Sequence, residues 1–170
     1  GRMTIRGAAR AYARDRASLD RLGDLLGAAA RDPERFRFCP DVAFALGAAP
    51  DPWARIVPPL PADPAGLVIG LNVSGLLDAG GDRAGNMFGL RADYRAAMGR
   101  LADRLLRGRP GARLLLTPHL FGDGIESDLR AYRRVRDRLD PALRPRAHLL
   151  DRASGPVRIK AAIGRCDFFI

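Results

Sequence analysis

The stretch GLVIGLNV, residues 66–73, decides the fold class of this chain. It is a short and nearly continuous apolar run, which is typical of a strand buried on both faces of a sheet. A helical segment follows at 91–108, and its apolar residues recur at helical spacing along one face: Tyr94, Met98, Leu101 and Leu105. A doubly buried strand followed by an amphipathic helix indicates a parallel α/β sheet.

The same alternation continues to Ile170. ARLLLTPH (112–119) predicts a second buried strand, and ESDLRAYRRVRDRL (126–139) predicts a helix with Ser127 as its N-cap. RAHLLD (146–151), SGPVRIKAAIG (154–164, with Ser154 as cap) and CDFFI (166–170) predict a strand, a helix and a last strand. We therefore expect a Rossmann-type parallel sheet with flanking helices. The last strand is expected inside the sheet, so we expect the C-terminal domain to be incomplete.

The first 48 residues carry a weaker version of this pattern, with a strand within 10–15, a helix at 18–30 and a strand at 41–46. They are predicted to be the C-terminal part of an N-terminal α/β domain. Residues 49–66 are rich in proline, which removes backbone donors and disfavours a preceding helix. This segment is predicted to be an extended interdomain connector, and 67–170 a partial C-terminal Rossmann-like domain.

The composition limits the kinds of ligand that this chain is expected to bind and the cell compartment in which it is expected to act. The net charge is +10 at pH 7, but of the 29 basic residues only Lys160 is lysine, and aromatic residues make up only 6%. Because the arginines are scattered rather than clustered, we expect no nucleic-acid binding, whereas an anionic small molecule or glycan suits the same field. Cys39 and Cys166 lie far apart and outside any C-x-x-C pattern, so a disulfide, a zinc site or another metal site is not expected. This cysteine usage predicts a cytoplasmic protein.

Polar residues cluster where the predicted strands end, which is where open parallel sheets bind ligands. Asn72, Ser74 and Gly75 follow the first buried strand, and Thr117 and His119 follow the second. Glycine permits close backbone approach, asparagine and serine can donate to an anionic oxygen, and histidine suits proton transfer near neutral pH. A plain turn after each strand is the alternative interpretation.

Three further positions are ambiguous. Ser127 and the first backbone N–H groups of its helix could hold a phosphate or carboxylate, or Ser127 could be a plain N-cap with Asp128 complementing the helix dipole. Arg14 precedes the first predicted helix beside Asp15, where a solvated charge pair is the alternative. His148 enters a strand rather than leaving one, so we interpret it as structural. The G-x-G-x-x-G fingerprint of dinucleotide-binding folds is missing.

Taken in order, RDRAS (14–18), PDVAFAL (40–46), IGLNVSGLL (69–77), LLLTPH (114–119), ESD (126–128) and IGRCDFFI (163–170) resemble the polysaccharide pyruvyl transferase family. The resemblance implies a GT-B-like protein with two Rossmann-type domains facing each other across a cleft. It implies transfer of the enolpyruvyl group of phosphoenolpyruvate to a pair of sugar hydroxyls, which leaves a pyruvate ketal and releases phosphate. It further implies no cofactor besides this donor, a saccharide or lipid-linked glycan acceptor, and peripheral membrane association through that acceptor.

The resemblance also assigns residues. Arg14 matches the arginine of the R-D-x-x-S motif and is expected to pair with the donor's phosphate or carboxylate. Asn72, Ser74, Ser127 and Asp128 are expected to line the donor site, and His119 is the expected catalytic residue. In the family, the strand matching CDFFI is followed by a G-x-R-x-H-A segment that has no counterpart here, so we expect a fragment that is inactive alone.

Two alternatives stay open. A GT-B-like glycosyltransferase that uses a nucleotide-sugar would share the architecture. A non-catalytic α/β binding module would use its basic surface to contact an anionic polymer.

Overall fold

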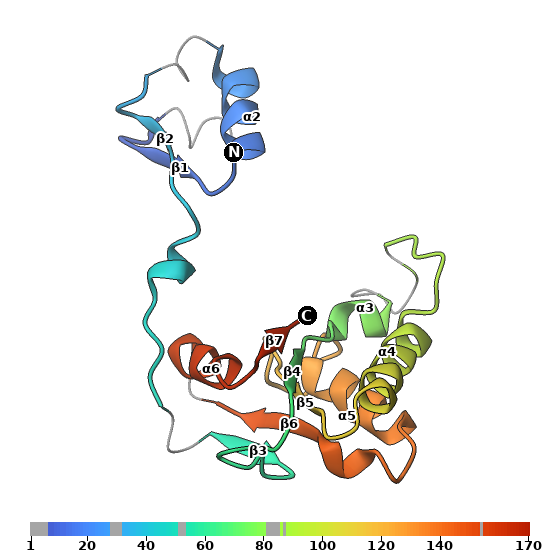
Figure 1. The fold of residues 1–170 in the computed structure, drawn as a ribbon. Coiled ribbons are helices and arrows are strands. Elements are labelled where there is room, and N and C mark those ends of the chain that lie inside the picture. Colours follow the sequence, from blue (N-terminus) through green and yellow to red (C-terminus); the bar gives the residue numbers. More distant parts are fainter. Residues whose placement is uncertain (1–6, 28–31, 51–53, 81–85, 87, 154) are drawn as a thin grey trace. The chain divides into compact units, whose positions relative to one another are not determined.

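A computed structural model describes residues 7–27, 32–50, 54–80, 86, 88–153 and 155–170. The chain divides into two compact units, Gly1–Gly47 and Ala48–Ile170 (Figure 1). No helix in the described part of the chain is long and apolar enough to cross a membrane.

The first unit is a small parallel β-α-β arrangement. Strand β1 (Ala11–Ala13) pairs in parallel with β2 (Phe36–Phe38), and helix α2 (Arg16–Leu26) connects them. Helix α2 begins after Asp15, whose carboxylate accepts the backbone N–H of Ser18 at 2.7 Å and so caps the first turn. The strand predicted within 10–15 and the helix are confirmed, although residues 28–30 lie outside the described ranges.

The strand predicted at 41–46 is wrong. This segment contains the 3₁₀ helix η2 (Val42–Ala45), and the strand of this unit is β2 instead. The Asp41 carboxylate accepts the N–H of Ala43 at 3.0 Å, which bends the chain into a turn directly after Pro40. Phe44 is 83% exposed, so the apolar run that suggested a buried strand is not buried within its unit.

The second unit is built on a five-stranded sheet of order β3-β6-β5-β4-β7. Its strands are β3 (Arg55–Val57), β4 (Val68–Leu71), β5 (Arg113–Leu116), β6 (Ala147–Arg152) and β7 (Phe168–Phe169). All neighbouring strands are parallel except β3, which runs antiparallel to β6. The four predicted strands and their parallel pairing are therefore confirmed. The proline-rich segment, expected only to connect, contributes the edge strand β3.

Helices cover both faces of this sheet. Helices α3 (Gly75–Ala79), α4 (Tyr94–Gly108) and α5 (Asp128–Arg138) lie on one side, and α6 (Pro156–Ile163) lies on the other (Figure 1). A short 3₁₀ helix, η3 (Arg144–Arg146), precedes β6. Ser154, the expected cap of α6, lies outside the described residues, and the helix follows Gly155. The structure is thus a mixed α/β fold with a mostly parallel sheet and flanking helices.

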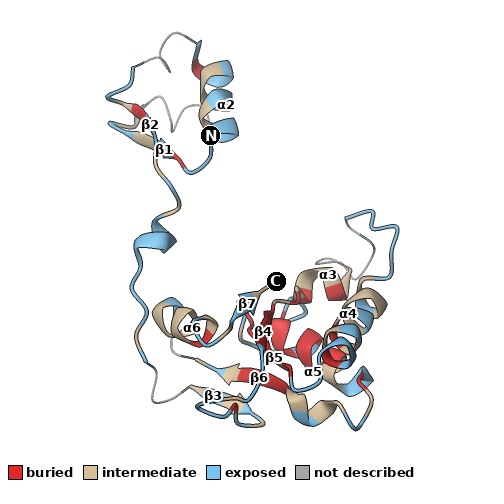
Figure 2. Ribbon diagram, in the orientation of Figure 1, coloured by how far each residue is buried: buried red, intermediate tan, exposed pale blue. Residues whose placement is uncertain are grey.

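The main core lies between the sheet and helices α4 and α5, where the buried residues concentrate (Figure 2). The predicted apolar face of α5 is fully confirmed as core: Leu129, Tyr132, Val135 and Leu139 are all buried. A smaller cluster on the opposite face contains Leu60, Val68 and Leu115. Leu60 comes from the proline-rich segment, which therefore covers part of the sheet.

The position expected for the last strand is wrong. Strand β7 pairs only with β4 among the described strands and lies at the sheet edge rather than inside it. Its register is fixed by close packing, because a Cβ at Gly70 would meet the Phe169 ring at 2.2 Å. Phe168 remains 63% exposed.

Candidate functional site

The carboxyl ends of β4 and β5 bring the predicted site residues of the second unit together. The two strands pair in parallel from Val68–Arg113 to Leu71–Leu116, so the residues after each end share one edge of the sheet. Asn72 leaves β4 at this edge, and His119 follows β5 two residues beyond Thr117. We call the group Asn72, Thr117, His119, Asp128 and Tyr132 the carboxyl-edge network.

Asp128 joins the two loops of this edge. It is the first residue of α5 and only 5% exposed. One carboxylate oxygen accepts the N–H of Gly75 at 2.7 Å, and the other accepts the N–H groups of His119 at 2.8 Å and Leu120 at 3.1 Å. A carboxylate that accepts three backbone N–H groups is held firmly, and these amides are then engaged. Asp128 therefore positions the loops, and its oxygens are already bonded.

Tyr132, on helix α5, also connects the ends of β4 and β5. Its hydroxyl donates to the carbonyl oxygen of Thr117 at 2.7 Å and accepts the backbone N–H of Val73 at 2.9 Å. The side chain is completely buried, and this burial raises the pKa of the phenol well above its usual value. Sequence reasoning placed Tyr132 only on an apolar helix face. A tyrosine among leucine and valine positions was the available signal, because a buried phenol needs a partner.

Asn72 and His119 form the solvent-facing part of the network. The Asn72 side-chain nitrogen lies 2.7 Å from His119 Nδ1, 3.1 Å from the Thr117 carbonyl oxygen and 2.9 Å from the Tyr132 hydroxyl. Asn72 is half-buried, whereas His119 is exposed to solvent. The network therefore supports a single accessible imidazole at the edge.

Ser74 and Gly75 begin a helix that the sequence analysis did not predict. The Ser74 hydroxyl accepts the N–H of Leu77 at 3.3 Å and caps α3, and its own N–H donates to the Tyr94 hydroxyl at 3.0 Å. Gly75 does permit close backbone approach, since a Cβ there would lie 2.3 Å from the carbonyl oxygen of Glu126. The close neighbour is the β5–α5 loop.

Two hydroxyls near this edge have no hydrogen-bond partner within the described part of the chain. The Thr117 Oγ1 and the Ser127 Oγ are both buried and unpaired. Ser127 occupies the predicted N-cap position of α5, but its side chain makes no capping hydrogen bond. Because buried hydroxyls ordinarily find a partner, these two leave hydrogen-bonding capacity unused beside the network.

Arg14 lies in the other unit. Its guanidinium contacts Asp41 at 3.2 Å, and its side chain is 75% exposed. The alternative interpretation, a solvated charge pair, is therefore seen with Asp41 rather than with Asp15, whose carboxylate caps α2.

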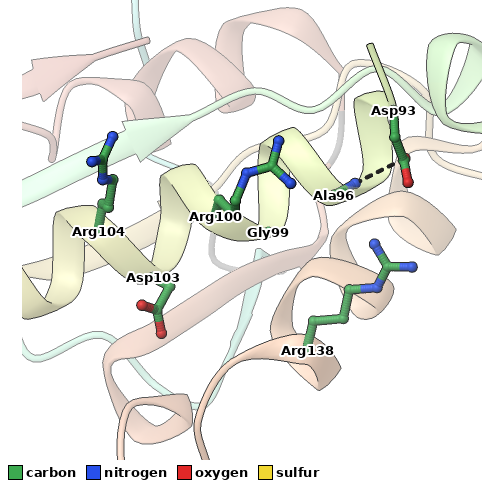
Figure 3. A pocket seen from close by; sticks show the side chains of 7 residues that line it. All are labelled: Asp93, Ala96, Gly99, Arg100, Asp103, Arg104 and Arg138. Carbon is green, nitrogen blue, oxygen red and sulfur yellow. Dashed lines mark hydrogen bonds between the residues drawn. The ribbon is translucent and has the colours of Figure 1, made fainter.

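Two other features lie away from the edge. His148 is buried in β6 with Nδ1 at 2.8 Å from the carbonyl oxygen of Pro58, which confirms its structural interpretation. A hollow of about 770 Å³ lies along α4 and the end of α5 (Figure 3). Its lining is dominated by charged side chains, among them Arg100, Arg104 and Arg138. Open α/β sheets bind ligands at the carboxyl ends of their parallel strands, and this hollow lies away from those ends, so we place the candidate site at the carboxyl edge instead.

The fold and this edge define a mixed α/β protein with a polar site at the ends of its parallel strands. In comparisons with known proteins, no family model, curated protein or solved structure matches the chain. Among the residues that the structure describes, no group of three or more His, Cys, Asp or Glu side chains is placed to hold a metal ion.

Proposed function

We propose that this chain is part of a GT-B-like polysaccharide pyruvyl transferase that acts in the cytoplasm on phosphoenolpyruvate and a saccharide or lipid-linked glycan. The proposal starts from the resemblance of the ordered motifs. The observation that carries it is the Asn72–His119 pair, which meets at 2.7 Å on the carboxyl edge of the parallel sheet. Ligands of open α/β sheets bind at this edge.

The reaction sets requirements that the proposed residues would meet. The methylene carbon of the donor gains a proton, one sugar hydroxyl oxygen attacks the adjacent carbon, and phosphate leaves with its bridging oxygen. The second hydroxyl oxygen then attacks the same carbon and closes the ketal. The two hydroxyls together lose two protons, of which one balances the proton gained by the methylene carbon and the other leaves with the released phosphate. Departure of phosphate requires groups that stabilise negative charge on oxygen. His119 is accessible for this purpose, and Ser74 supplies a hydroxyl at the same edge. The Ser127 hydroxyl is buried beside them, and the donor-binding role of Arg14 follows from the resemblance alone.

Donor binding is tested on this chain by ¹⁵N NMR. Phosphoenolpyruvate should shift the amide resonances of Ser74 and His119, and His119→Gln should weaken its affinity at least tenfold. A uridine or guanosine diphosphate sugar that shifts these resonances while phosphoenolpyruvate does not would favour the glycosyltransferase alternative. Binding only of anionic polymers, with steep loss at higher salt, would favour the binding module.

The role of Arg14 is tested separately. Arg14→Ala should lower the affinity for phosphoenolpyruvate, because a guanidinium–phosphate pair is lost. Arg21→Ala is the matched control, since Arg21 is an exposed arginine of the same unit on α2. Equal affinity in both variants would remove Arg14 from the donor site. Release of phosphate from phosphoenolpyruvate and a mass gain on the acceptor glycan test the full reaction.

A further inference from the structure

The orientation of the Asn72 side chain is fixed by its neighbours. The atom placed as its nitrogen faces three groups: His119 Nδ1, the Thr117 carbonyl oxygen and the Tyr132 hydroxyl. The Tyr132 hydrogen already points to the Thr117 carbonyl at 2.7 Å. An amide oxygen at this place would therefore face the Thr117 carbonyl and the Tyr132 oxygen without a donor. The two hydrogens of an NH₂ group can serve all three neighbours when one hydrogen is shared between two acceptors.

This orientation determines which ring nitrogen of His119 carries the proton in the neutral imidazole. Because Asn72 presents only hydrogens, the Nδ1 atom at 2.7 Å must accept with its lone pair. In the neutral imidazole the proton then resides on Nε2. The main chain of His119 is fixed as well, since its N–H donates to Asp128 at 2.8 Å. The ring is thus held from the end of β4, and the backbone from the start of α5.

We propose that His119 presents its Nε2–H as a fixed hydrogen-bond donor to an anionic oxygen of the ligand, a phosphate or carboxylate oxygen, and that Asn72 is the positioning residue that sets this tautomer. Only the identity of the ligand rests on the proposed function. Protonation of Nδ1 would place two donors against each other at the Asn72 contact. His119 therefore acts through its Nε2–H, which stabilises negative charge on the leaving phosphate oxygen, rather than as the base that takes a hydroxyl proton.

The tautomer is measured on the ligand-free chain. In ¹⁵N spectra at pH 8, His119 should show a protonated Nε2 and an unprotonated Nδ1, with a scalar coupling between Asn72 Nδ2 and His119 Nδ1. Asn72→Asp reverses the contact, because a carboxylate can only accept, and should move the proton to Nδ1. Asn72→Ala should abolish the coupling and leave both tautomers populated. An Nδ1–H tautomer in the wild type, or an unchanged tautomer in Asn72→Asp, would overturn the assignment. The wild-type spectrum tests the assignment by itself, so the test remains valid if the Asn72→Asp variant is unstable.

The ligand is tested with inorganic phosphate and phosphoenolpyruvate as probes. Each should shift the Nε2 and Hε2 resonances of His119 in the wild type, and the shift should be at least fivefold smaller in Asn72→Asp. If inorganic phosphate shifts them and phosphoenolpyruvate does not, the donor role holds and the proposed function fails. If neither anion moves these resonances, the donor role is wrong whatever the tautomer.

Discussion

Asp128→Asn tests whether one buried carboxylate holds the carboxyl edge together. The substitution keeps the shape and removes the charge, but an amide has only one accepting oxygen. The three N–H groups of Gly75, His119 and Leu120 lie on both sides of the carboxylate. At least one of them must then face an NH₂ group. An unsatisfied buried N–H costs about 1–3 kcal/mol, and the remaining bonds lose their charge assistance.

We therefore expect the free energy of unfolding of Ala48–Ile170 to fall by about 2–4 kcal/mol, the lower end reflecting relief from burying a charge. For a unit of this length, that corresponds to a decrease in Tm of roughly 8–14 °C. Urea unfolding followed by circular dichroism gives the free energy, and hydrogen exchange reports the three amides directly. Asp93→Asn is the control, because Asp93 is an exposed N-cap of α4 whose side chain accepts the N–H of Ala96, and asparagine caps equally well. An Asp128→Asn chain within about 0.5 kcal/mol of wild type, with unchanged exchange at these amides, would refute the reasoning.

Three further changes probe the same fold. Tyr132→Phe should lower the free energy of unfolding by about 2 kcal/mol, because it leaves a buried backbone N–H without its acceptor; an unchanged urea midpoint would contradict this. Gly75→Ala should destabilise by at least about 2 kcal/mol, since its Cβ would lie 2.3 Å from the Glu126 carbonyl, whereas Gly124→Ala, with open space around it, should not. Burial lowers the pKa of His148 from its usual value near 6.5, so the unfolded chain takes up a proton more readily as the pH falls below that value. The free energy of unfolding should therefore decrease from pH 7 to pH 5 by up to about 1.4 kcal/mol per pH unit from this group, and the decrease should be smaller in His148→Gln. An equal decrease in the wild type and the variant, measured by urea unfolding at the two pH values, would disprove it.

The sequence predicted the parallel strands well because their signal is local. A run such as Val68–Leu71 is apolar throughout, and burial on both faces is what such a run indicates. Strand β3 escaped prediction because its three residues lie among prolines and gain their order from pairing with β6. The opposite error occurred at 41–46, where an apolar run predicted a strand. The structure has a short 3₁₀ helix there, whose start is stabilised by the Asp41 carboxylate. Edge and interior strands were also confused, because strand order is a tertiary property.

At the site, the sequence located the residues but not their contacts. Asn72, His119 and Asp128 were chosen because they follow strands or open a helix, and the structure brings them to one edge. That Asp128 bonds backbone amides, and that Asn72 bonds a histidine, depends on loops that meet only in three dimensions. Tyr132 was missed because its ring fits the apolar helical pattern, and a hydrophobic pattern takes no account of the hydroxyl group.

The three backbone amides around Asp128 form a carboxylate-binding site that is filled by a side chain of the same chain. Removing the carboxylate by Asp128→Gly would leave an empty site of the size and polarity of formate or acetate, lined by the same three N–H groups. Millimolar formate should then restore thermal stability to the glycine variant while leaving the wild type unaffected. If such complementation is observed, this turn of the chain could host interchangeable small carboxylates, and its rigidity could be adjusted from outside by adding a salt.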